Sequence, residues 1–362
     1  MARDPDTEMI DSEHTPEAEP SSDGVAPARD LTVKSSDAQE KLLVLLRALL
    51  SLPKWFWIVG VVLLVGSTVP FAGLANVPEG FQIGGKSTDG VNSAVDWIVV
   101  NGDPVFSAIN SGLLTYLLLP LEKWLLLLPW WLVIAVVVVI SYRIVGPIFA
   151  GVAVGLMLIV ATLGIFELAI STLALVIIAT LLSVLLGVPT GILAARSDRF
   201  DALLRPFLDA MQTMPSFVYL IPVLMLFGLG MVPAVLATVI YAVPPVIRLT
   251  NLGIRQVDSS VIEAARAFGS TANQLLFKVQ IPLAMPTIMA GLNQTIMMAL
   301  AMVTIAAIIG ARGLGVEVLN GIARLDVGRG LIGGIGIVVM AIILDRITQG
   351  FARSQQRTKP AQ

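Results

Sequence analysis

One eight-residue segment matches a pattern that binds nucleotide phosphates. It reads Gly-Phe-Gln-Ile-Gly-Gly-Lys-Ser from Gly80 to Ser87 and fits G-x4-G-K-S. Phosphate binding by this pattern needs a buried strand before the loop and a helix after it, because that frame directs backbone N–H groups at the phosphates. Here Pro78 and an apolar stretch precede the match, a Thr-Asp-Gly turn follows it, and no strand pattern is present. We therefore interpret the match as accidental and expect no nucleotide or other cofactor site in this chain.

The residues that usually build metal centres and nucleophilic active sites are scarce. The chain has no cysteine, which excludes disulfides and thiolate metal sites. Its single histidine, His14, lies in a polar N-terminal segment and forms neither a zinc site nor a catalytic triad alone. The formal net charge is −2 and no basic patch occurs, so nucleic acid is not an expected partner. We predict that the chain is not an enzyme by itself.

A polar loop in the last third of the chain carries explicit helix-capping signals. Ser260 is followed three residues later by Glu263, the spacing of a capping box, which predicts a short helix from Val261. Gly269 suits the left-handed conformation that ends such a helix. Alanines at 264, 265 and 267 keep this helix slim enough to enter a groove on a partner.

A second helix is predicted directly after the first. Thr271 and Gln274 repeat the capping-box spacing, and Pro282 is expected to stop the helix that they begin. The loop is therefore predicted to form two short helices joined by a sharp bend.

The elements that hold this loop are apolar. Hydrophobic residues make up 56% and charged residues 13% of the 362-residue chain, whereas soluble proteins are about a quarter charged. The first 40 residues differ: they are polar, acidic and rich in proline and serine, and they lack the features of a signal peptide. We expect residues 1–40 to form a disordered cytoplasmic tail and residues 351–362 a short cytoplasmic C-terminal tail.

The apolar runs predict an all-α integral membrane protein with about eight transmembrane helices, because about 20 apolar residues cross the hydrocarbon layer. The expected spans are 55–75, 126–142, 144–165, 170–194, 215–231, 233–250, 284–309 and 331–348.

Lys and Arg residues indicate the orientation of these spans, since cytoplasmic loops carry the excess of positive charge. Most of them fall on one side if both termini are cytoplasmic, and the exception is an outer loop with Arg312, Arg324 and Arg329. The predicted division is an additional N-terminal span in 41–80, external segments in 81–125, and a transmembrane domain in 126–350 that contains the polar loop at 251–283.

The external segments have helical spacing without the length of a span. Apolar residues recur between Val91 and Val99, and a second stripe follows Asp103 and Pro104, which suit a helix start. This pattern predicts a pair of amphipathic helices along the outer face of the membrane, or else helices packed against neighbouring spans.

The polar loop resembles a known signature. Glu263-Ala264-Ala265, a glycine six residues after the glutamate and the closing Val279-Gln280-Ile281-Pro282 are similar to the loop of importer permeases in the ATP-binding cassette (ABC) class. The resemblance implies a coupling helix that docks on an ATPase subunit. The residues that it implicates are Glu263, Ala264, Ala265, Arg266, Gly269 and Pro282. The alternative is an ordinary capped hairpin between two spans.

A narrower resemblance covers roughly residues 90–350. Segments 209–215, 241–248, 277–294, 313–315, 321–326 and 343–349 look like the permeases of glycine betaine/proline uptake systems. Two departures are the additional span near 55–75 and the charge of Arg312. The resemblance implies a permease for glycine betaine, proline or related compatible solutes, with choline, carnitine, taurine or methionine as alternative cargoes.

The same resemblance implies the partners. They are two cytoplasmic ATPase subunits that hold ATP and Mg, a second copy of this chain, membrane lipid and a separate extracellular or periplasmic substrate-binding protein. The expected location is the bacterial inner membrane. A secondary transporter driven by an ion gradient is the alternative class, but Glu167 alone lies near a span interior and the polar loop would have no role.

Candidate residues for a translocation path lie on one long span. They are Asn293, Gln294, Thr295, Met298 and Thr304. Polar groups at membrane depth usually face the protein interior, so these side chains either line a path or make hydrogen bonds between helices.

Overall fold

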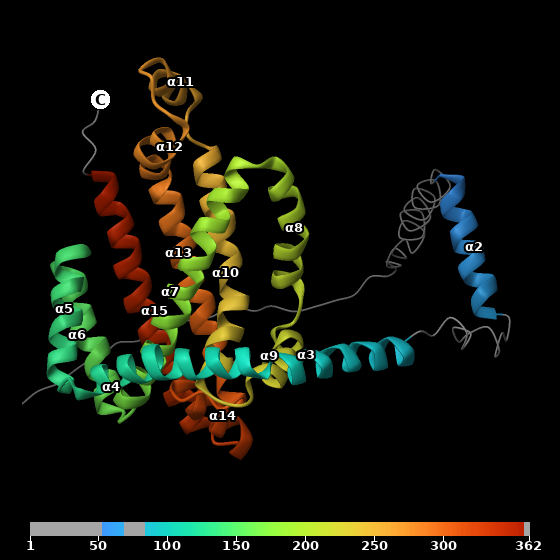
Figure 1. Cartoon of the computed structure of the whole chain (residues 1–362). Helices are drawn as coiled ribbons and strands as arrows, with labels where there is room; N and C mark the ends of the chain where they lie inside the picture. The colour runs from blue at the N-terminus through green and yellow to red at the C-terminus, as the bar shows by residue number, and fades with distance from the viewer. Residues whose placement is uncertain (1–52, 69–83, 358–362) are drawn as a thin grey trace, which may run out of the picture. The chain divides into compact units, whose positions relative to one another are not determined.

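The computed structural model describes residues 53–68 and 84–357, and these residues contain helices and no strands (Figure 1). The prediction of an all-α membrane protein is confirmed. The chain divides into two units, Met1–Gly84 and Gly85–Gln362. In the first unit, α2 (Lys54–Thr68) has 15 residues, and its apolar side chains from Ile58 to Val65 are exposed. The tail with His14 and the second half of the span expected at 55–75 lie outside the described residues.

The second unit begins with a helix where a pair was expected. α3 (Gly84–Gly112) runs through Pro104 without a break and continues through the π-helix η2 (Leu113–Leu118) into α4 (Leu119–Leu127). The predicted pair is therefore wrong: Pro104 lies inside the helix, which accommodates the lost backbone hydrogen bond. The second half of the phosphate-binding match, Gly84 to Ser87, forms the first turn of α3, and its first half lies outside the described residues.

Two of the expected spans are short helices. α5 (Trp130–Ile144) has 15 residues and α6 (Pro147–Thr162) has 16, so each extends for about 23 Å, less than the hydrocarbon thickness. Gly146 joins them with a φ of 130°, a conformation that favours glycine.

The span expected at 215–231 is a bent pair. α8 (Asp198–Thr213) and α9 (Ser216–Phe227) meet at 99°. Met214 between them is extended, with ψ of 134°, because Pro215 disfavours helical backbone at the residue before it.

Within residues 53–68 and 84–357, five helices are long and apolar enough to cross a membrane, or six if α8 and α9 count as one span. The predicted count of eight is not confirmed. The five are the helix at 87–127, α7 (Phe166–Arg196), α10 (Met231–Arg255), the helix at 272–308 and α15 (Val327–Arg357), whose apolar part ends at Ala352.

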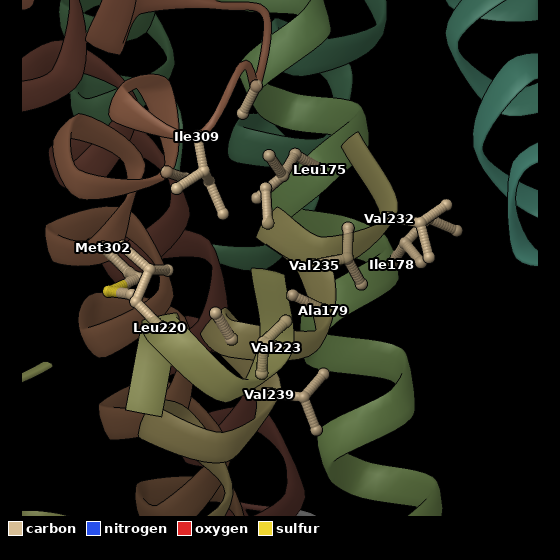
Figure 2. Packing of buried hydrophobic residues seen from close by; sticks show 14 of the residues in the cluster. Leu175, Ile178, Ala179, Leu220, Val223, Val232, Val235, Val239, Met302 and Ile309 are labelled. Atoms are coloured by element: carbon tan, nitrogen blue, oxygen red, sulfur yellow. The ribbon is translucent and has the colours of Figure 1, made fainter. Parts of the chain in front are cut away.

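The core is built around α10, which packs on α7 and on α13 (Ile281–Ile308). Glycines permit the close approach: a Cβ on Gly191 of α7 would lie 2.6 Å from Cβ of Thr250, and one on Gly291 of α13 would lie 3.0 Å from Cβ of Leu249. Small residues at helix contacts allow this packing in membrane proteins. Figure 2 shows an apolar cluster of this core, which includes Leu175, Val235 and Met302.

One end of the bundle carries α14 (Leu314–Arg324), which packs on α15 and α13. Gly313 precedes it with a φ of 130° and lies against Thr172, whose hydroxyl accepts a hydrogen bond of 2.8 Å from Leu314 N. The opposite end of the bundle carries the polar loop (Figure 1).

Candidate functional site

The polar loop begins with a capped helix, α11 (Ser259–Ala267). Its N-cap is Asp258, whose carboxylate accepts a 2.8 Å hydrogen bond from Ser260 N. The predicted cap, Ser260, is wrong by two residues, because an aspartate two positions earlier satisfies the same free N–H groups. The Ser260 N–H and hydroxyl hold the pKa of the Asp258 carboxyl below its usual value.

The end of α11 matches the prediction. Gly269 has a φ of 80°, and its N–H donates to Arg266 O over 2.9 Å. Ser270 N donates to Ala265 O over 3.1 Å. This pair of bonds is a Schellman motif, in which a left-handed glycine satisfies the last carbonyls of a helix.

The second capping box is confirmed, but the stop at Pro282 is wrong. Thr271 and Gln274 exchange both hydrogen bonds of the box at the start of α12 (Ala272–Gln274). The helix then continues through the π-helix η3 (Leu275–Gln280) directly into α13. The wider turn of the π-helix gives the ring of Pro282 room beside the preceding carbonyls, so the proline does not end the helix.

We call α11, α12 and the turn between them the coupling hairpin (residues 258–274), after the role that the resemblance implies. α11 has no buried residue, and Glu263, Ala264 and Arg266 are exposed. Phe268 at the turn is 90% exposed, the most exposed aromatic side chain among the described residues. Phe268 was not predicted from the sequence, although an aromatic residue in an alanine-rich polar loop is a signal that could have indicated it. An exposed aromatic beside a slim helix is typical of a docking surface.

The candidate path residues on α13 divide between two environments. Thr295 is buried, and its hydroxyl donates to Ala242 O of α10 over 2.8 Å. The Asn293 amide donates to Oδ1 of Asp345 on α15 over 2.9 Å. These two residues make hydrogen bonds between helices, which is the alternative role that the sequence left open.

Other path candidates lie elsewhere on the helix. Gln294 is exposed, together with Ala290, Met297 and Ala301 on the same face. Met298 is partly buried against an apolar cluster, and Thr304 is partly exposed. Of the five candidates, Gln294 has the exposure expected of a path-lining residue.

Charged side chains connect α8 with α10 on the loop side of the bundle. Asp201 is 6% exposed and accepts hydrogen bonds from Asn251 and Arg205 over 2.7 and 2.6 Å. Arg255 donates to Asp198 over 2.6 Å and to Ala194 O over 2.8 Å.

A separate ion pair lies deeper in the helices. Asp209 of α8 binds Arg248 of α10, seven residues or about 10 Å before the end of α10. Their side chains are 63% and 41% exposed. Neither residue was predicted from the sequence as part of a site, because 39 positions separate them.

These helices with an exposed hairpin at one end belong to a permease subunit of an ABC importer, as the matching family and relatives show. Residues 187–357 match the family described as "Binding-protein-dependent transport system inner membrane component". The chain belongs to this family of bacterial inner-membrane permeases.

Several curated proteins are similar to half of the chain or more. The Escherichia coli "Glycine betaine/proline betaine transport system permease protein ProW" is 50% identical over 74% of this chain and 75% of its own length. The Listeria monocytogenes "Glycine betaine/carnitine transport permease protein GbuB" is 56% identical over 50% of this chain and 64% of its length. The Bacillus subtilis "Glycine betaine transport system permease protein OpuAB" is 44% identical over 72% of this chain and 92% of its length. A solved MetNI methionine ABC transporter in an inward-facing conformation is 18% identical, with a TM-score of 0.48 over 53% of this chain and 95% of that chain.

Proposed function

We propose that this permease imports glycine betaine, proline betaine or a related compatible solute, with energy from ATP hydrolysis on partner subunits. The observation that carries the cargo is the 50% identity over 267 residues with a glycine betaine/proline betaine permease. Carnitine, which stands in the name of the GbuB relative, is the second candidate cargo.

The coupling hairpin is the proposed contact with the ATPase. Phe268, Glu263 and Ala264 are exposed on a short helix that is fixed at both ends by its own caps. A preorganised helix of this kind docks in a groove with little loss of conformational entropy. The chain itself holds no ATPase site in this proposal, and ATP and Mg bind to a pair of cytoplasmic ATPase subunits. The hairpin lies on the cytoplasmic side in this proposal.

A second copy of the chain completes the path. The exposed face of α13 with Ala290, Gln294, Met297 and Ala301 is small and weakly polar, which suits a helix that faces a partner across a narrow passage. A separate substrate-binding protein delivers cargo at the α14 end.

The test is ATP-dependent uptake of radiolabelled glycine betaine into proteoliposomes that contain this permease, its co-purifying ATPase and its binding protein. Glu263→Arg is the comparison, because it reverses a charge on the exposed face of α11 and touches no buried residue. We expect uptake by the wild type and loss of uptake by Glu263→Arg with the membrane domain intact. Co-purification of the ATPase without uptake would reject the cargo, and failure of any ATPase to bind would reject the importer.

A further inference from the structure

The Asp209–Arg248 ion pair joins α8 to a helix that is long and apolar enough to cross a membrane. Arg248 lies about 10 Å before the end of α10, and ionisable side chains on membrane-spanning helices often mark functional positions. The side chains of this pair are 63% and 41% exposed. Their charges therefore remain accessible to a third group.

The register of α8 against α10 shows which way Arg248 points. Asp201 and Asp209 are eight residues apart on α8, about 12 Å, but their partners Asn251 and Arg248 are three residues apart on α10, about 4.5 Å. Because the spacing on α10 is shorter than the spacing on α8, the Arg248 side chain must extend toward the N-terminal end of α10 to contact Asp209. Helical side chains normally lean in this direction.

Tyr241 lies in that direction, two turns before Arg248 on α10. Its ring stacks on that of Tyr219 from α9, with centroids 6.5 Å apart and an angle of 29° between the planes. Tyr219 is 8% exposed, and within the described part of the chain its buried hydroxyl has no hydrogen-bond partner. Buried polar groups in proteins almost always have a partner, so this hydroxyl marks the ring pair as a candidate contact for a ligand.

Gln294 of α13 lies beside the part of α10 that carries Tyr241. The hydrogen bond from the Thr295 hydroxyl to Ala242 O places their chain neighbours Gln294 and Tyr241 at the same level of the two helices. About one turn before Thr295 on α13, Gly291 packs against Leu249 of α10. The α7 helix packs on the other side of α10, against Val246 and Thr250. Tyr241, Arg248 and Gln294 are therefore on the side of α10 and α13 that faces away from α7.

We propose that Arg248, Asp209 and the Tyr219–Tyr241 pair form a transient site for a small zwitterion in the membrane path. The guanidinium of Arg248 binds the carboxylate of the cargo. The quaternary ammonium lies against a ring face of the tyrosine pair and is balanced by the Asp209 carboxylate, since aromatic faces attract such cations. This site rests on the proposed function, because it takes a zwitterionic compatible solute as its ligand.

The test compares two rates in proteoliposomes that contain the complete importer. One is ATP hydrolysis stimulated by the binding protein, and the other is uptake of radiolabelled glycine betaine. Arg248→Gln, Asp209→Asn and Tyr241→Leu are each expected to lower uptake per ATP hydrolysed about tenfold, with stimulated hydrolysis preserved. Arg248→Lys keeps the charge and is expected to recover uptake to within about threefold of the wild type.

Two further variants separate cargo contact from structure. Tyr219→Phe keeps the ring and removes only the unpartnered hydroxyl, and we expect uptake per ATP to fall about threefold. Arg205→Gln is the matched control, because Arg205 pairs with Asp201 within α8 and is 70% exposed. It is expected to change neither rate.

Each outcome decides the proposal. Uptake and hydrolysis that fall together in Arg248→Gln would show that the pair only joins α8 to α10, and unchanged rates would show that cargo passes elsewhere. A wild-type importer with stimulated hydrolysis but no betaine uptake would reject the proposed cargo, and this site with it, before any variant is compared.

Discussion

The contact between α10 and α13 and the coupling hairpin belong to one continuous stretch of chain, yet they are stabilised in opposite ways. The helix contact depends on Gly291 and Gly253, where an added Cβ would lie within 3.0 Å of atoms on the facing helix. The hairpin has no buried side chain in α11 and is held by its own caps, Asp258, Gly269 and Thr271. Tight packing makes the first region resist change, and self-contained capping leaves the second free to bind a partner without refolding.

A substitution in the neighbouring contact between α7 and α10, which is packed in the same way, is expected to have the largest effect. Gly191→Leu would place a Cβ 2.6 Å from Cβ of Thr250 and 2.7 Å from the backbone oxygen of Ile247, and backbone cannot move aside as a side chain can. We expect a loss of about 3 kcal/mol in the free energy of unfolding, measured as a lower thermal midpoint of the purified permease. Gly155→Ala is the control, because no atom lies within 4 Å of its added Cβ. An unchanged midpoint in Gly191→Leu would contradict the packing argument.

The corresponding change in the hairpin should affect binding and leave stability unchanged. Phe268→Ala removes a 90% exposed ring that contacts no core. We expect the ATPase to bind the permease about 30-fold more weakly, as for an aromatic residue at the centre of an interface, with an unchanged thermal midpoint. Phe207→Ala, a 63% exposed ring on α8, should leave ATPase affinity unchanged. Equal affinities for Phe268→Ala and the wild type would show that the hairpin docks by another face.

A smaller effect is expected where a single polar bond joins the packed helices. Thr295→Val keeps the shape of the side chain and removes the hydroxyl that donates to Ala242 O. We expect a loss of about 1 kcal/mol in the free energy of unfolding, by thermal denaturation. Thr190→Val is the comparison, since the Thr190 hydroxyl donates to Leu186 O within the same helix. We expect this variant to lose less free energy of unfolding than Thr295→Val. Equal losses would show that the bond between helices adds nothing.

The smallest effect concerns the cap of α11 and depends on pH. The pKa of Asp258 is lowered in the folded protein, so its contribution to hairpin stability is complete above the ordinary carboxyl pKa and is lost as the pH falls through the folded value. Asp258→Asn keeps an acceptor without titrating. The ratio of hairpin amide exchange rates in the variant and the wild type should therefore exceed one near pH 6 and approach one near pH 3. A ratio independent of pH would exclude the charge of Asp258 from the cap.

The sequence predicted local features that nearby residues decide. Gly269 and the pair Thr271 and Gln274 have the predicted conformations because each depends on atoms within a few residues. The first cap was misplaced because Asp258 and Ser260 both have side chains that suit an N-cap, and their spacing does not show which one the backbone uses.

Features that depend on distant contacts could not be predicted. Gln294 and Thr295 are adjacent and both polar, but one is exposed and the other binds Ala242, and only the packing of α10 decides which. Pro104 and Pro282 were expected at helix boundaries, and both lie in continuous helices, because a proline is tolerated where the surrounding turns compensate. The pairing of Asp209 with Arg248 depends on the bend between α8 and α9, which the hydrophobicity pattern did not reveal.

The continuous helix from Ala272 to Ile308 connects the coupling hairpin to the other end of the bundle as one rigid element. Its 37 residues form a rod about 55 Å long that joins the coupling hairpin to the opposite end of the bundle. A tilt of about 10° around the midpoint would displace its two ends by about 5 Å in opposite directions. A force on the hairpin would therefore rotate the whole helix as a rigid body and move its opposite end. Side chains between the hairpin and that end would not need to rearrange in sequence.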